Sequence, residues 1–125
     1  MEKIGNIYFV RRSKDNKSGF IDPECKDLRY KVLICISLFP NPELVWPGRQ
    51  DMLEYERGKM SSLYALGIFD WKVLEAVKGH NHSIDIAAEF PNILVARRAF
   101  EQATNVARIV DIYLYDNGRL VDKLD

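Results

Sequence analysis

Apolar residues fall into short blocks along the first third of the chain, and their spacing predicts β-strands. Ile4 to Val10 is rich in β-branched and aromatic residues, which is typical of a strand. Arg29 to Phe39 gives the strongest strand signal, because most of its residues are apolar at consecutive positions. A run of this kind is expected for a strand that is covered on both faces of a sheet. Phe39-Pro40-Asn41-Pro42 ends it, because proline has no N–H to donate to a ladder.

Helical spacing replaces this pattern in the middle of the chain. Residues from about Gln50 to Leu66 are predicted to form a helix, and Gly67 is its expected C-terminal stop. Asp70 is the expected N-cap of a second helix that reaches Lys78. A β-hairpin over residues 69–90 stays open as the alternative, because the run from Phe69 to Val73 also alternates between apolar and polar residues.

The last third of the chain combines helical and strand signals. Ser83 is the candidate N-cap of a short helix over Ser83–Phe90, which the Pro91-Asn92 pair interrupts. Residues Ile93–Arg108 give the clearest helical pattern, with apolar residues recurring at helical spacing. A hairpin is then predicted, in which Ile109–Tyr115 and Arg119–Leu124 are strands joined by Asp116-Asn117-Gly118.

These elements predict one α+β domain over residues 1–125. Residues 1–48 are expected to be its β-rich part with a central buried strand, and residues 49–125 its helical part ending in a hairpin. A chain of 125 residues with 47% apolar content is long enough for one core. The longest apolar run, Val32–Phe39, is far shorter than the roughly 20 residues that a membrane span needs. With no secretory signal in view, we expect a cytoplasmic protein with reduced cysteines and no membrane contact.

The element order over residues 69–124 resembles the winged helix-turn-helix superfamily. The resemblance rests on the order short helix, turn, longer helix and hairpin, with these packing positions: Ala87, Ala88, Phe90 and Phe100. It implies that the longer helix enters the major groove of DNA, so that its N-terminal residues meet base edges. The expected readers of bases are Asn92, Arg97 and Arg98, whereas Arg108 and Arg119 are expected to contact phosphates. Pro91-Asn92 stands where these motifs usually have a glycine.

Charge sets limits on this interpretation. The chain has 18 basic and 18 acidic side chains and a formal net charge of zero, which counts against a protein that coats nucleic acid broadly but allows a local basic face. Arg97 and Arg98 also fit a solvated helix face that binds nothing. A symmetric DNA site would require a homodimer, and the N-terminal strands or helix 50–66 are expected to supply the contact.

Candidate catalytic and metal-binding residues are few. His80 and His82 flank Asn81, but two histidines lack the third and fourth ligands that a zinc site needs. Cys25 lies next to Lys26, with no histidine near it in the sequence. A glycine-rich phosphate loop is missing as well. We therefore predict a non-enzymatic protein without cofactor or metal, and a small enzyme using His80 or His82 is the least favoured alternative.

A second function class also fits the sequence. Small size, neutral charge and the lack of a catalytic motif are typical of a protein-binding inhibitor or immunity module that caps a partner protein. In this hypothesis Trp46, in a loop rich in proline, is the candidate anchor, because tryptophan is enriched at interface hot spots. The two hypotheses are thus a nucleic-acid-binding regulatory protein and a protein-binding module.

Overall fold

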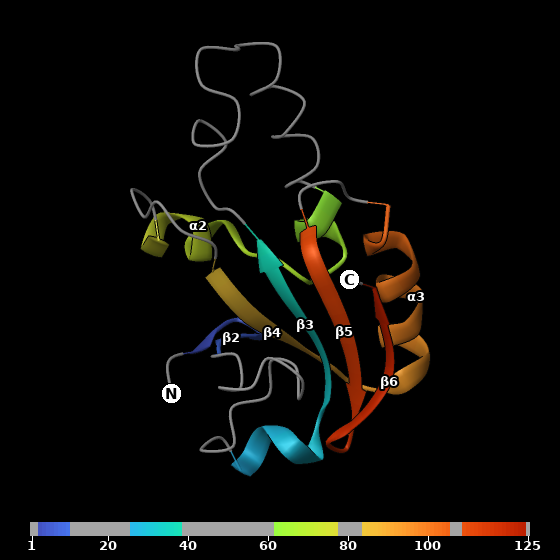
Figure 1. The fold of residues 1–125 in the computed structure, drawn as a ribbon. Coiled ribbons are helices and arrows are strands. Elements are labelled where there is room, and N and C mark those ends of the chain that lie inside the picture. Colours follow the sequence, from blue (N-terminus) through green and yellow to red (C-terminus); the bar gives the residue numbers. More distant parts are fainter. Residues whose placement is uncertain (1–2, 11–25, 39–61, 78–83, 106–108, 125) are drawn as a thin grey trace.

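The computed structural model of the chain describes residues 3–10, 26–38, 62–77, 84–105 and 109–124. These residues form an α+β fold based on a six-stranded antiparallel sheet with strand order β1-β2-β4-β3-β5-β6 (Figure 1). The α+β class predicted from the sequence is confirmed. Among the described residues no helix has the length and apolar content needed to cross a membrane.

The elements follow the chain in a simple order. The strands are Lys3–Ile4 (β1), Ile7–Phe9 (β2), Val32–Leu38 (β3), Ile84–Phe90 (β4), Ile109–Asp116 (β5) and Arg119–Leu124 (β6). The helical elements are the 3-10 helix Lys26–Tyr30 (η1) and the α-helices Trp71–Val77 (α2) and Ile93–Ala103 (α3). Residues 62–65 are also helical.

The central strand is β3, as its two-sided apolar pattern predicts. It pairs with β4 on one side, where Val32 lies opposite Phe90, and with β5 on the other, where Val32 lies opposite Asp116. Residues 33–37 of this strand are all buried. The strand begins later than the sequence pattern indicates, because Arg29 and Tyr30 belong to η1.

Two hydrophobic clusters cover the two faces of the sheet. Side chains that point to the helix-covered face pack against the helices, with Val73 and Val77 from α2 and Ala96 and Phe100 from α3. The second face carries a smaller cluster composed of Val10, Leu28, Leu33, Cys35, Ala87, Tyr113 and Tyr115. Alternate residues of one strand point to opposite faces, so β3 contributes to both clusters.

Residues 84–90 form β4 and not the short helix that we predicted over Ser83–Phe90. Ile84, Ile86, Ala88 and Phe90 are buried against the helices, while Asp85 and Glu89 on the other face are half-buried. Ala87, on the same face as Asp85 and Glu89, is also buried. Burial on both faces suits a strand between two neighbours, and the energy of burial there outweighs the helix propensity of Ala87, Ala88 and Glu89. The predicted helix is wrong, and so is the alternative hairpin over 69–90, because β4 pairs with β2 and β3.

The predicted strand Ile4–Val10 is a hairpin instead. The chain turns at Gly5 and Asn6, so that Ile4 lies opposite Ile7. Gly5 has a φ of +60°, a conformation that glycine adopts without steric cost. Two short strands therefore replace one, and β2 continues the sheet beside β4.

Other predicted elements are present where the structure describes them. The helix after Asp70 is α2, the helix after Asn92 is α3, and the C-terminal hairpin is β5 and β6 around Asn117-Gly118. Gly67, with a φ of +75°, follows the helical residues 62–65 as the expected stop. The strand β4 precedes α3, so the described residues do not show the helix-turn-helix arrangement. Residues 50–61 of the other predicted helix lie outside the described part.

Candidate functional site

The structure places the predicted DNA-reading residues around α3 and β6. Asn92 is the N-cap of α3, and its Oδ1 accepts a hydrogen bond of 3.0 Å from the Val95 backbone N–H. Arg97, half-exposed on α3, has its Nη1 3.6 Å from Oδ2 of Asp122 on β6. Arg98 and Arg119 are exposed. Arg108 and Trp46 lie outside the described residues.

An ion pair connects α3 to β6 in the structure. It joins Arg97 of the helix to Asp122 of the edge strand, and the two elements lie next to one another on the right of the view in Figure 1. Two of the proposed base-reading side chains therefore already have intramolecular partners: Asn92 holds the helix terminus and Arg97 neutralises an aspartate. Arg98 and Arg119 are the accessible arginines among the predicted set that the structure describes.

A second group of exposed residues gathers at the end of the sheet where β5 turns into β6. The registers Val32–Phe90 and Val32–Asp116 bring the start of β3, the end of β4 and the end of β5 to this end of the sheet. The 3-10 helix η1 lies here beside the β5–β6 turn (Figure 1), where the Asn117 N–H donates to the Lys31 carbonyl at 3.2 Å. The N-terminus of α3 follows β4 at the same end.

Large side chains on these elements are strongly exposed. Tyr30, the last residue of η1, has 80% of its surface in solvent, and Leu94 in the first turn of α3 has 74%. Arg29 and Asn92 beside them are also exposed. We call these four residues, Arg29, Tyr30, Asn92 and Leu94, the hairpin-end surface.

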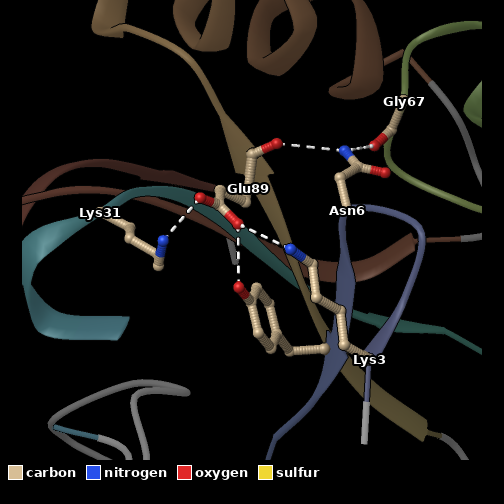
Figure 2. Close-up of polar contacts among 6 residues, drawn as sticks. Lys3, Asn6, Lys31, Gly67 and Glu89 are labelled. Carbon is tan, nitrogen blue, oxygen red and sulfur yellow. Dashed lines mark hydrogen bonds and ion pairs between the residues drawn. The ribbon is translucent and has the colours of Figure 1, made fainter. Parts of the chain in front are cut away.

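A polar cluster on the second face of the sheet is built around Glu89 of β4 (Figure 2). Its Oε1 accepts a hydrogen bond of 2.8 Å from Lys31 Nζ, and its Oε2 accepts one of 2.9 Å from the Tyr8 hydroxyl. Lys3 Nζ lies 3.4 Å from the same Oε2 and 5.1 Å from the centre of the Tyr8 ring. The cluster thus joins β1, β2 and β4 to Lys31, which immediately precedes β3.

The interactions in this cluster favour the charged forms of Glu89 and Lys3. The Lys31 ammonium, followed by the Tyr8 hydroxyl, lowers the pKa of Glu89, although partial burial opposes this shift. The Tyr8 hydroxyl and Glu89 raise the pKa of Lys3. A general acid or base at neutral pH needs a pKa near 7, and both shifts move away from it. The arrangement suits a structural clamp better than proton transfer.

Asn6 extends this clamp to the helix-covered side of the molecule. Its side-chain Nδ2 donates to the Gly67 carbonyl at 2.8 Å and to the Glu89 carbonyl at 3.1 Å (Figure 2). The backbone carbonyl of Asn6 accepts a further hydrogen bond of 2.8 Å from the Glu89 N–H. One turn residue therefore holds the N-terminal hairpin, β4 and the loop after residues 62–65 together.

The described part of the chain gives little support for a catalytic nucleophile or a metal site. Cys35 lies at the centre of the sheet, and burial, with the nearby Asp85 carboxylate, raises the pKa of its thiol well above its ordinary value. A thiol in this state is a poor nucleophile. No group of three or more potential metal ligands occurs among the described residues. Cys25, His80 and His82 lie outside them.

Sequence reasoning missed both the hairpin-end surface and the Glu89 cluster. The apolar run places Tyr30 in the central strand, where an aromatic residue is expected to be buried. A helix over residues 83–90 would not pair with β2 and β3, so the sequence pattern offers no reason to expect Glu89 beside Tyr8 and Lys31. The alternation of Ile84, Ile86 and Ala88 is the signal that could have placed Glu89 on a sheet.

Comparisons with protein-family models, with curated proteins and with solved structures give no significant match for this chain.

Proposed function

We propose that this chain is a non-catalytic protein-binding module that caps a partner protein through the hairpin-end surface. The observation that carries the proposal is the exposure of Tyr30 and Leu94, at 80% and 74%, on η1 and α3, which lie at the same end of the sheet and pack on its two opposite faces. Tyr30 lies in a short 3-10 helix next to the β-turn, and Leu94 lies in the first turn of α3. Both side chains are thus held on elements of fixed geometry.

The chemistry of this surface resembles the centre of a protein interface. Burial of a leucine or an aromatic side chain that is otherwise exposed contributes about 1.5–3 kcal/mol. Tyrosine and arginine are enriched among the residues that dominate binding energy, and Arg29 adjoins Tyr30. The side-chain oxygen of Asn92 already accepts a hydrogen bond in the cap of α3. Asn92 therefore stabilises the start of the helix that carries Leu94, and its side chain is less available to a partner.

A nucleic-acid partner is the competing hypothesis, and it draws on a different set of residues. Arg98 and Arg119 are exposed, and α3 lies beside the β5–β6 hairpin as a recognition helix lies beside a wing. The strand β4 in place of the preceding helix weighs against this hypothesis, because a winged helix uses that helix to set the angle of the recognition helix. The apolar Leu94 also fits a protein surface better than a phosphate backbone.

The experiment compares two variants of the full chain in the cells that naturally produce it. Tagged wild-type protein is expected to be recovered as a defined complex, from which the partner is purified and titrated by calorimetry. Tyr30→Ala/Leu94→Ser is expected to weaken binding by about a hundredfold, since two hot-spot side chains are removed. Tyr64→Ala, which truncates a tyrosine that is 51% exposed and belongs to the helical residues 62–65, is the matched control and is expected to bind like wild type.

Two results would overturn the proposal. The first is full binding by the Tyr30→Ala/Leu94→Ser protein while its thermal unfolding is unchanged. The second is recovery of nucleic acid instead of protein, with retention that falls steeply as salt rises and is lost in Arg97→Ala/Arg98→Ala. That outcome would establish the competing hypothesis.

A further inference from the structure

The strand β6 leaves an uncovered edge in the described part of the fold. It is the last strand in the sheet order, and among the described strands it pairs with β5 alone. All six of its residues are exposed, including the apolar Leu120 at 47%, Val121 at 40% and Leu124 at 47%. An edge strand of this kind presents its outward N–H and C=O groups to another strand.

The register against β5 shows how the side chains of β6 are distributed. Arg119, Leu120 and Asp122 lie opposite the consecutive residues 116, 115 and 114, and the register shift leaves Val121 as an extra residue. Opposed residues share a face, so Arg119 and Asp122 lie on the helix-covered face and flank Leu120 on the second face. The Arg97–Asp122 ion pair agrees with this placement, because α3 covers that face.

The β-bulge at Val121 therefore creates a self-complementary edge. Without the extra residue, Asp122 would point to the same face as Leu120. With it, a basic and an acidic side chain lie one pleat on either side of a leucine. A two-fold axis through Leu120 places Arg119 opposite Asp122 of a second copy, and symmetry repeats the pair on the other side of the axis.

The backbone suits the same arrangement. Asn117 and Gly118 have φ values of +52° and +80°, as a two-residue type I′ hairpin turn requires. The residues that close such a turn, Asp116 and Arg119, form the hydrogen-bonded pair, and bonded and non-bonded pairs alternate along an antiparallel ladder. The N–H and C=O groups of Leu120 consequently point to the open edge, where the two-fold pairing uses them.

We propose that β6 pairs antiparallel with β6 of a second copy of this chain, with Leu120 on the two-fold axis and Arg119 opposite Asp122. Each Asp122 would then lie between Arg97 of its own chain and Arg119 of the second copy. Lys123 would lie opposite the glycine of the β-turn, so no like charges oppose each other in this register. The inference goes beyond the proposed function, because it rests on β6, which contributes no residue to the hairpin-end surface.

The test exchanges charges across the axis and measures mass by sedimentation over about a hundredfold range of concentration, because association depends on protein concentration. Arg119→Asp and Asp122→Arg each place two like-charged pairs at the interface, and each is expected to raise the dissociation constant about tenfold or more. An equimolar mixture of the two variants is expected to restore dimers. In the mixed dimer the two substituted side chains face each other with opposite charges, and so do the two native ones. The double variant Arg119→Asp/Asp122→Arg is expected to dimerise by itself.

Controls separate this result from changes in folding. Lys123→Glu alters a charge of the same strand that lies opposite glycine in the proposed dimer and is expected to leave the dissociation constant within about threefold. Arg97→Ala reports the effect of losing the Arg97–Asp122 pair alone, and circular dichroism verifies that every variant is folded. A wild-type chain that stays monomeric throughout the range, or a mixture of single variants that stays monomeric, overturns the inference. The Tyr30→Ala/Leu94→Ser protein is expected to remain dimeric, because the paired strand contains neither residue. A failure of the proposed dimer can therefore be distinguished from a failure of the proposed function.

Discussion

Glu89 is the best residue for a quantitative test of the structure, because its carboxylate joins segments from distant parts of the sequence. The perturbation is a double-mutant cycle with Glu89→Gln and Lys31→Met, set against a second cycle with Glu89→Gln and Lys3→Met. Glutamine keeps the shape of the side chain and removes its charge. The two cycles therefore measure how strongly each lysine is coupled to the charge of Glu89.

The expected magnitude follows from distance and exposure. Lys31 Nζ lies 2.8 Å from Oε1, with side-chain exposures of 34% and 25%, whereas Lys3 Nζ lies 3.4 Å from Oε2 and is more exposed at 45%. Hydrogen bonds to charged groups contribute about 1.5–3 kcal/mol, and exposed ion pairs about 0.2–1 kcal/mol. The partly exposed Lys31 pair falls between these ranges, so we expect a coupling energy of about 1 kcal/mol. The Lys3 coupling is expected to be clearly smaller.

Urea unfolding at pH 7 provides the assay, with the midpoint giving the change in the free energy of unfolding if the slope stays constant. A loss of about 1 kcal/mol corresponds to a fall of about 3–6 °C in the melting temperature of a domain of this size.

The pH dependence of the coupling adds a second readout. The folded-state pKa of Glu89 is lower than its ordinary value of 4.5, so its stabilising effect is present above that value. The effect is lost as the pH falls through the lower, folded-state pKa, because the carboxyl is then protonated. A Lys31 coupling no larger than the Lys3 coupling, or one that persists unchanged in strong acid, would refute this account of the cluster.

Three further substitutions test other parts of the structure. Asn6→Ala removes the hydrogen bonds of 2.8 and 3.1 Å to the Gly67 and Glu89 carbonyls and is expected to cost about 1–2 kcal/mol in urea unfolding, and an unchanged midpoint would contradict the role of Asn6. Asn92→Ala removes the N-cap of α3 and is expected to cost about 1 kcal/mol in thermal unfolding, whereas Asn92→Asp keeps a capping oxygen and is expected to be neutral or stabilising. Gly118→Ala places a Cβ 3.2 Å from the Arg29 carbonyl at a φ of +80° and is expected to cost about 1 kcal/mol or more, while Asn117→Gly at a φ of +52° is tolerated.

The parts of the fold that the sequence predicts correctly are those with a local cause. Asn117-Gly118 specifies its own turn, Asn92 specifies the start of α3, and the continuous apolar run of β3 specifies a strand covered on both faces. Each of these signals is complete within a few neighbouring residues, so it does not depend on the remainder of the chain.

Residues 84–90 show why local signals were insufficient elsewhere. Ala87, Ala88 and Glu89 favour a helix by propensity, and only the presence of β2 and β3 on either side makes the strand better. The candidate sites depend on the same long-range pairing. Glu89 meets Lys31 because β4 and β3 are neighbours, and Tyr30 and Leu94 reach one end of the sheet because Val32 lies opposite Phe90. The spacing of residues in the sequence does not indicate which strands pair, so it does not predict these contacts.

The position of β3 has a consequence for how the chain folds during synthesis. This strand leaves the ribosome well before its two neighbours, which are residues 84–90 and 109–116. Until both have been translated, the most apolar segment of the protein has no partner on either edge. Sheets closed by such distant segments form slowly, and exposed strand edges favour aggregation in the interval. Nascent chains shortened before β5 are therefore expected to depend on chaperones, and release of the full C-terminal hairpin is the step that completes the sheet.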